Sequence, residues 1–247
     1  MRCPATSPIS RCNRWARRPA RSRARPGRRE QMQMNSIHKV ALYGAPCSLA
    51  NALLAETLSR QLNATAIVDE LNAIAASPGL STRNGTPFEA DSVGRSVAGM
   101  DAVIAVLSSP HLADGNETAG FSRIYDSTIA LLDGLAVAGV ERLLLIADHA
   151  WLQDDRALPA ERVEHLQHSL FKSPIAWTLV DTPRQIGPWL TLDDCLHPAH
   201  SVQRDTVIAL QPFASSVMDE CLQGTNVHQR LHIETSAERR LRAEEAL

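Results

Sequence analysis

The stretch that decides the fold is Val40-Ala-Leu-Tyr-Gly-Ala-Pro-Cys-Ser-Leu-Ala50. Its apolar run 40–43 predicts a buried strand, and Gly44 opens a short turn. The turn is followed by leucines at helical spacing: Leu49, Leu53, Leu54, Leu58 and Leu62. This spacing predicts a helix over 48–62, with Ser48 placed to cap it.

The same alternation continues along the chain. Apolar runs predict further strands at 64–68, 101–107, 142–147 and 175–180. Amphipathic segments predict helices at 87–98, 121–138, 159–171 and 212–223, the last of which precedes 227–233. The runs are nearly continuous in apolar residues, as strands covered by helices on both faces must be. We therefore expect an α/β fold with a Rossmann-like, doubly wound parallel sheet in a single domain.

The expected domain spans 37–233, between an Arg-rich N-terminal segment, 1–36, and a charged C-terminal tail, 234–247. Three interpretations of the N-terminal segment stay open: a disordered basic arm, a transit peptide, or a translated leader upstream of a start at Met32 or Met34. We favour the leader because Met34 leads directly into the first strand-like segment.

Charge and cysteine usage narrow the class of protein. The 247 residues carry 25 Lys and Arg against 27 Asp and Glu, but 1–31 alone hold ten arginines and one acid, which leaves net −11 for the rest. An acidic body argues against nucleic-acid binding through the folded domain. Five scattered cysteines without a C-x-x-C pair suit the reducing cytoplasm. No apolar run is long enough for a membrane span.

The turn after the first strand carries a resemblance to a known family. With Asp101–Ile104, 131–145 and 176–183, it resembles the atypical short-chain dehydrogenases/reductases, which include NmrA-like and NAD(P)H-binding flavin or biliverdin reductase-like proteins. The resemblance covers roughly 38–233. These relatives usually carry G-x-x-G-x-x-G at the turn, whereas this chain keeps Gly44 and has Cys47 and Ala50 at the other two positions.

The resemblance implies that the cofactor is NAD or NADP, bound with a small-molecule substrate. Pyrophosphate contacts fall on Gly44, Ala45, Pro46, Cys47, Ser48 and Leu49, and the edge of the nicotinamide site falls on Ser108 and Thr182. Asp69 follows the second strand, where Rossmann domains place the acid that binds the ribose, and its neighbour Glu70 favours NAD over NADP. Two alternatives stay open: a vestigial turn, and an Asp69 that merely ends a strand.

The implied function is an oxidoreductase that transfers hydride to a small organic or flavin acceptor. The alternative is an NmrA-like nucleotide sensor or a pseudoenzyme that acts through protein partners. The family's Tyr-x-x-x-Lys pair is absent, because its positions align with Pro159 and Val163. His111 and His149 remain as candidate proton donors in the loops after two strands.

Three side hypotheses concern other polar residues. Cys47 at a helix N-terminus can be an oxidation-sensitive thiolate. His168 and Lys172 imitate the Tyr-x-x-x-Lys spacing, but should face elsewhere. One cluster holds residue types that bind zinc: Asp194, Cys195, His197 and His200. Pro198 and the irregular spacing within this cluster lead us to expect no metal.

Overall fold

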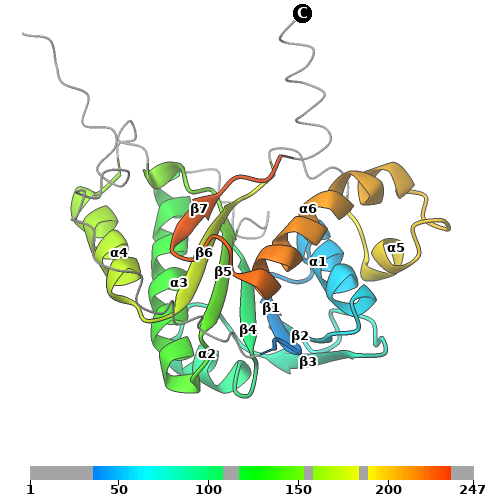
Figure 1. The fold of residues 1–247 in the computed structure, drawn as a ribbon, viewed down its shortest axis with the longest axis horizontal. Helices are drawn as coiled ribbons and strands as arrows, with labels where there is room; N and C mark the ends of the chain where they lie inside the picture. The colour runs from blue at the N-terminus through cyan, green and yellow to red at the C-terminus, as the bar shows by residue number, and fades with distance from the viewer. Residues whose placement is uncertain (1–35, 108–116, 153–157, 184–188, 235–247) are drawn as a thin grey trace, which may run out of the picture.

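The fold is a parallel sheet between two layers of helices. The computed structural model describes residues 36–107, 117–152, 158–183 and 189–234. Within them the sheet has seven strands in the order β3-β2-β1-β4-β5-β6-β7, and every neighbouring pair is parallel. The strands are β1 Lys39–Tyr43, β2 Asn63–Val68, β3 Leu80–Asn84, β4 Ala102–Val106, β5 Arg142–Ala147, β6 Ala176–Asp181 and β7 Gln229–Leu231. The expected Rossmann-like α/β fold is confirmed (Figure 1).

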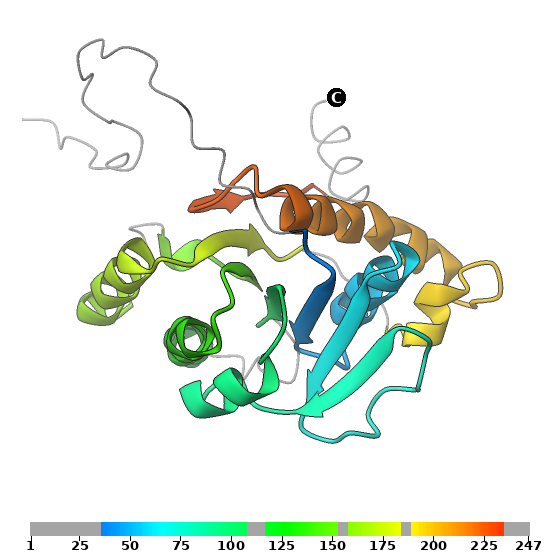
Figure 2. The same cartoon turned by 60° about the horizontal axis from the view of Figure 1, so that its bottom comes forward.

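Helices cover both faces of the sheet (Figures 1 and 2), three on each face within the described residues. One layer contains α1 Ser48–Ser59, α5 Leu192–Leu196 and α6 Arg204–Gln223. The other contains α2 Ala90–Ser96, α3 Glu117–Ala138 and α4 Ala160–Lys172. Side chains alternate between the two cores, so that Leu42 packs under α1 and Tyr43 packs under α2.

The strand order reverses beside β1. From β1 the chain moves outward to β2 and β3, then returns to β4 on the other side of β1 and continues to β7. Such a reversal leaves a crevice at the edge of the sheet where the strands end, here called the carboxyl edge. The opposite side, where the strands begin, is called the amino edge.

Several elements differ from the sequence expectation, among them the short helix α5, which was not expected. Strand β3 was not expected, because Leu80–Asn84 is a polar edge strand whose side chains are only partly covered. Helix α6 begins at Arg204 rather than at 212, so Pro212 lies inside it. The buried face of α6 is continuous across this proline, through Val207, Leu210, Phe213 and Val217, and its packing outweighs the missing backbone N–H.

Candidate functional site

The turn after β1 is shaped by one glycine. Gly44 has φ +97°, a conformation that side chains disfavour, and a Cβ built on it would lie 2.3 Å from the carbonyl oxygen of Val106 in β4. No larger residue fits this position without a shift of the backbone. The absence of a side chain therefore lets the turn lie directly against the end of β4, at the point where the strand order reverses.

Cys47, at the position of the family's middle glycine, caps the next helix. It is the N-cap of α1, and its Sγ accepts a hydrogen bond from the Ala50 N–H at 3.4 Å. The expectation that Ser48 is the cap is wrong. Burial raises the pKa of the Cys47 thiol above its ordinary value. The structure thus contradicts the hypothesis of a reactive thiolate, because the low dielectric outweighs the helix N-terminus.

Ser48 and Asn51 hold a distant segment against α1. The Ser48 hydroxyl accepts a hydrogen bond from the Leu190 N–H at 2.9 Å, and the Asn51 Nδ2 donates to the Leu190 carbonyl at 2.8 Å. Both polar groups of one buried backbone unit are therefore satisfied by the first turns of α1. The Ser48 side chain is therefore committed to this segment and not to the cleft.

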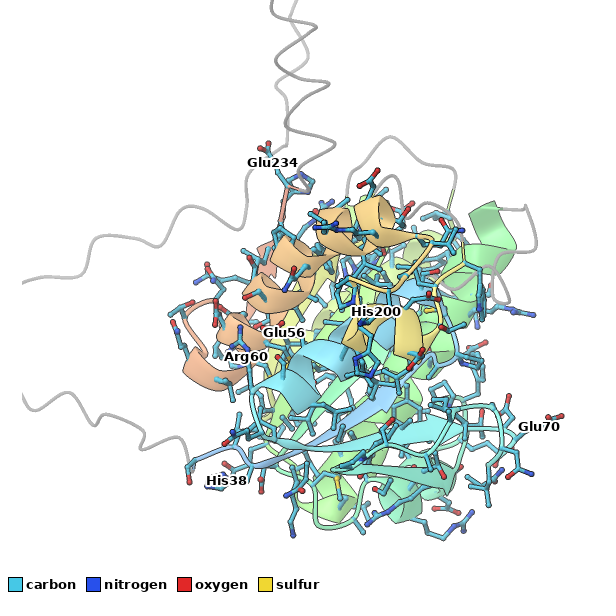
Figure 3. The ribbon with its side chains drawn as sticks, turned by 90° about the vertical axis from the view of Figure 1, so that its right-hand side faces the viewer. His38, Glu56, Arg60, Glu70, His200 and Glu234 are labelled. Carbon is cyan, nitrogen blue, oxygen red and sulfur yellow. The ribbon has the colours of Figure 1, made fainter. Side chains whose placement is uncertain are left out.

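A cleft of about 410 Å³ opens at the carboxyl edge, beside the Gly44 turn. Its lining comes from the ends of four strands: Tyr43, Gly44, Ala45, Pro46, Ile67, Val68, Asp69, Glu70, Ala73, Gly85, Thr86, Pro87, Phe88, Val106 and Leu107. In Figure 3, Glu70 of this cleft and His38, which precedes β1, lie at opposite ends of the strands. The sequence-predicted residues Gly44, Ala45, Pro46 and Asp69 are brought together here, whereas Cys47, Ser48 and Leu49 point into the core.

The charge of this cleft is negative. Asp69 and Glu70 are exposed, and the lining residues that the structure describes include no lysine, arginine or histidine. The nearby Arg83 turns its guanidinium away, toward the carbonyl oxygens of Ser96 and Ala98. The backbone around Asp69 is held in place by Asn84, whose Nδ2 donates to the Asp69 carbonyl at 2.6 Å.

Sequence reasoning missed one wall of the cleft. Thr86, Pro87 and Phe88 follow β3, and Phe88 remains 39% exposed although it lines the cavity. The signal that could have revealed this wall is Leu80-Ser-Thr-Arg-Asn-Gly85, a short run with a β-branched residue that ends in glycine. Its polar character hid the strand that carries the wall.

The other half of the carboxyl edge is built by β5 and β6. The Thr182 N–H donates to the Ala147 carbonyl at 3.2 Å, which extends the pairing of these strands by one residue. Ser108 and His111 lie outside the described residues. Thr182 directly follows β6 and is not among the described residues that line the cleft.

His149 follows β5 but is buried completely. Its Nε2 lies 3.1 Å from the Leu145 carbonyl, and burial lowers the pKa of the ring to about 4. The His149 imidazole is therefore neutral near pH 7. Its side chain also has no exposed surface that a substrate could reach. The structure therefore opposes the expectation that His149 donates a proton to a bound substrate.

The family's Tyr-x-x-x-Lys proton donor is not replaced by the residues at its aligned positions or by either tyrosine of the chain. Pro159 is the N-cap of α4 and Val163 packs at the edge of the core. The Tyr43 hydroxyl bonds to Ser96 at 2.6 Å, and the Tyr125 hydroxyl bonds to His165 Nδ1 at 2.8 Å. His168 and Lys172 are exposed on α4, as expected.

The zinc hypothesis is not supported by the arrangement around α5. Asp194 completes a capping box with Thr191 and accepts a hydrogen bond from Ser201. Burial raises the pKa of the Cys195 thiol to about 12, which disfavours the thiolate that a metal would need. Within the described residues no three His, Cys, Asp or Glu side chains gather as a metal site.

A family model described as NAD(P)H-binding matches residues 44–183, more than half of the chain. The chain belongs to this NAD(P)H-binding family. The match begins at the Gly44 turn and ends just after Thr182, so it includes both halves of the carboxyl edge. The resemblance to NAD(P)H-binding reductase-like proteins, first seen at this turn, is confirmed.

Solved structures with the same fold are distant in sequence. The oxidoreductase ylbE from Lactococcus lactis has 12% identity and a TM-score of 0.56, over 85% of this chain and 97% of its own. A nucleoside-diphosphate-sugar epimerase from Staphylococcus aureus has 14% identity and a TM-score of 0.56, over 80% and 71%. The Bordetella bronchiseptica enzyme WbmG, in complex with NAD, has 14% identity and a TM-score of 0.55, over 85% and 77%.

At such low sequence identity, the similarity to these solved structures shows a common fold and nothing about function. A search of curated proteins finds no match to this chain. No helix in the described parts of the chain is long and apolar enough to cross a membrane.

Proposed function

We propose that this NAD(P)H-binding protein is an oxidoreductase that uses NAD(H) and transfers hydride to or from a small organic or flavin acceptor. The observation that carries the proposal is the cleft of about 410 Å³ at the Gly44 turn, with Asp69 and Glu70 on its rim. It lies at the carboxyl edge beside the reversal of strand order, where nucleotides bind in folds of this kind. We also propose a cytoplasmic location, because the scattered cysteines suit a reducing compartment.

The residues present fit the adenosine half of a dinucleotide. The Gly44 turn lies directly against Val106 of β4, and both residues line the cleft. The Asp69 carboxylate can accept hydrogen bonds from both ribose hydroxyls, while Phe88 and Pro87 offer an apolar wall to the base. The backbone N–H groups of Ser48 and Leu49, at the start of α1, would face the pyrophosphate. Pro46 contributes no donor there.

The preference for NAD over NADP follows from charge. The 2′-phosphate of NADP would enter a lining whose described residues include Asp69 and Glu70 but no basic side chain. Two carboxylates repel a phosphate, and nothing in the described lining compensates for them. For NAD, the same carboxylates are hydrogen-bond acceptors for neutral hydroxyls.

The chemistry divides between cofactor and protein. Bound NAD(H) supplies or accepts the hydride at its nicotinamide ring. The protein's part is to orient the dinucleotide along the carboxyl edge, with Thr182 and Ser108 at the nicotinamide end. Neither Pro159 nor Val163 can replace the family's Tyr-x-x-x-Lys proton donor, so an acceptor that takes its proton from water suits this site best.

One observation favours a second candidate, a nucleotide sensor without catalysis. The dyad positions hold Pro159 and Val163, and His149 is buried and neutral. A sensor of the NmrA-like kind requires the adenosine cleft but no proton donor. Turnover separates the two: an oxidoreductase oxidises NADH in the presence of a flavin or quinone acceptor, whereas a sensor binds NADH without consuming it.

The proposal is tested by calorimetric titration of the full chain with NADH and with NADPH. We expect NADH to bind more tightly, and the Asp69→Asn variant to lose about tenfold in NADH affinity, because a charged hydrogen bond to ribose contributes about 1.4 kcal/mol. Asp133→Asn, on the exposed side of α3, removes the same charge away from the cleft and should change nothing. Equal or tighter binding of NADPH, or an unchanged Asp69→Asn variant, would refute the proposed site.

A further inference from the structure

Strands β6 and β7 bring three polar side chains together at the carboxyl edge. Asp181 is the last residue of β6, Arg230 belongs to β7, and His232 directly follows β7. The Arg230 Nε donates to both carboxylate oxygens of Asp181, at 2.8 and 3.1 Å. The His232 Nδ1 lies 3.3 Å from the Asp181 Oδ2. One carboxylate therefore binds a guanidinium and an imidazole, and we call these three side chains the β6–β7 cluster.

The β6–β7 cluster lies on the face of the sheet that α3 and α4 cover. Side chains alternate along a strand, so Asp181 points to the same face as Leu179, which packs in the core beneath these helices. The buried His149 after β5 is close by, because its pKa, set chiefly by burial, also responds to the charges of Asp181 and Arg230. Helix α4 begins at the same edge with Pro159, the position of the missing tyrosine. The cluster thus shares a face with the lost Tyr-x-x-x-Lys pair.

The Asp181 carboxylate orients the imidazole of His232. A carboxylate only accepts hydrogen bonds, so the Nδ1 that faces it carries a hydrogen. The other ring nitrogen, Nε2, is bonded to no residue in the described part of the chain, and the side chain is 49% exposed. This nitrogen can take a proton from water and pass it to a substrate, as carboxylate-oriented histidines do in enzymes.

The cluster is also within reach of the nicotinamide end of a bound dinucleotide. Strands β4 and β5 lie between β1 and β6, so the ends of β1 and β6 are roughly 14 Å apart at the usual strand spacing. An extended dinucleotide with its adenosine in the cleft covers such a distance. Thr182, which we place at the nicotinamide end, directly follows Asp181.

We propose that His232 is the proton donor of this oxidoreductase and that the acceptor is a small aldehyde or ketone, an inference that rests on the proposed function. A hydride that adds to a carbonyl carbon leaves an alkoxide, which must be protonated. An oriented imidazole serves this class of acceptor directly. Asp181 is a positioning residue, and Arg230 engages both oxygens of its carboxylate.

The reaction balances with NADH and one proton from the solvent. The carbonyl carbon receives a hydride with both its electrons from NADH, and the π pair of the C–O bond moves onto oxygen. The oxygen forms an O–H bond with the proton of the His232 Nε2, and the neutral imidazole regains a proton from water. The products are NAD⁺ and an alcohol. The proton still comes from water, but by way of His232.

Steady-state oxidation of NADH by the full chain tests the donor. 4-Nitrobenzaldehyde is the carbonyl probe and FMN is the flavin probe. With the aldehyde we expect kcat to fall about 100-fold in His232→Gln, a typical loss for a general acid, while the Kd for NADH in calorimetry stays the same. His168→Gln, at an exposed position of α4, is the matched control and should change neither value.

Asp181→Asn tests the positioning role. The amide can still accept a hydrogen bond from Arg230, but it also presents a donor, so it no longer fixes the hydrogen of His232. Long-range proton–nitrogen correlation should show hydrogen on Nδ1 in the natural chain and a mixture of tautomers in the variant. Hydrogen mainly on Nε2 in the natural chain would overturn the assignment.

A further measurement needs no turnover. Diethyl pyrocarbonate modifies accessible histidines, and mass spectrometry locates them. NAD⁺ together with trifluoroethanol, an alcohol that resists oxidation, should protect His232 and leave His168 as reactive as before. Equal modification of His232 with and without these probes would show that the substrate does not reach it, and would overturn the proposal.

The outcomes separate this inference from the proposed function. Reduction of FMN but not of the aldehyde, or full activity of His232→Gln, would overturn the donor and leave the oxidoreductase standing. NADH binding without reduction of either probe would overturn the donor and support the nucleotide sensor. Failure of NADH to bind would overturn both proposals.

Discussion

The two edges of the sheet treat their polar groups in opposite ways. At the amino edge, the buried Arg142 donates to the Ala176 carbonyl, to the Thr178 hydroxyl and to Glu220, whose carboxylate also accepts hydrogen bonds from Thr225 and Asn226. At the carboxyl edge, the acids Asp69 and Glu70 are left exposed around a cleft. The polar groups at the amino edge bond to one another, whereas the exposed carboxylates at the carboxyl edge can bind a ligand.

The difference teaches where stability and binding reside. Arg142 and Glu220 form an ion pair at 2.9 Å with side chains only 3% exposed, so removing one partner leaves a buried charge. Exposed acids such as Asp69 contribute little to folding, but they can bind. Changes at the amino edge should therefore lower stability without altering nucleotide affinity, and changes at the carboxyl edge should do the reverse.

Arg142→Ala should have the largest effect. It strands the Glu220 carboxylate in the core, so we expect the free energy of unfolding to fall by about 4 kcal/mol in chemical denaturation. The matched control is Arg60→Ala, which breaks the partly exposed pairs with Asp219 on α6 and with Glu56 on α1 (Arg60 and Glu56 are labelled in Figure 3). This change should cost about 1 kcal/mol or less. Equal losses in the two variants would show that the burial of the Arg142–Glu220 pair makes no difference to its contribution.

Acid should weaken the fold through His149. Its pKa is lowered from 6.5 to about 4 in the folded chain by burial, so between these values the unfolded chain binds a proton that the folded one refuses. Stability is thus present above pH 6.5 and declines as the pH falls toward 4, by about 3 kcal/mol. Denaturation across this range measures the decline, and His149→Gln should flatten it. An unchanged slope in that variant would show that other groups are responsible.

Gly44→Ala should affect both stability and binding. Gly44 and Gly99 both have positive φ, but a Cβ meets Val106 at the first and nothing within 4 Å at the second. Gly99→Ala therefore measures the cost of the backbone conformation alone, about 1 kcal/mol. Gly44→Ala should lose about 2 kcal/mol or more and bind NADH less well, as measured by denaturation and calorimetry. Equal losses at the two glycines would argue against the close approach to β4.

Cys47 should give the smallest effect. Cys47→Ala removes a weak cap and a buried sulfur, so we expect a loss of about 1 kcal/mol in thermal or chemical denaturation. Cys47→Ser replaces the acceptor and should recover part of it. NADH affinity should be nearly the same in both variants, because the thiol does not line the cleft. A large gain in affinity on removing the thiol would show that Cys47 obstructs the phosphate.

The sequence predicted the strands, helices and turns whose residue pattern is visible within a short segment. Apolar runs such as 142–147 can only be buried strands, and a glycine between a strand and a helix predicts the binding turn. Strand β3 could not be found this way, since Leu80–Asn84 is a polar edge strand held by β2. The early start of α6 was missed because tertiary packing carries the helix through Pro212.

The same limit applies to the site. Asp69 and the Gly44 turn were recognisable from spacing, and both line the cleft. The role of Ser48 was not, because its partner Leu190 lies 142 residues away. The burial of His149 also depends on how the chain turns after β5, which no pattern in the sequence reveals.

Hydrogen exchange of the full chain with and without NADH tests the contrast between the edges most directly. Binding should slow exchange in 44–50, 69–73 and 85–88, around the cleft, and leave the amino-edge segment 220–228 unchanged. Slowed exchange confined to other segments, or none at a saturating NADH concentration, would contradict the assignment of the cleft to the dinucleotide.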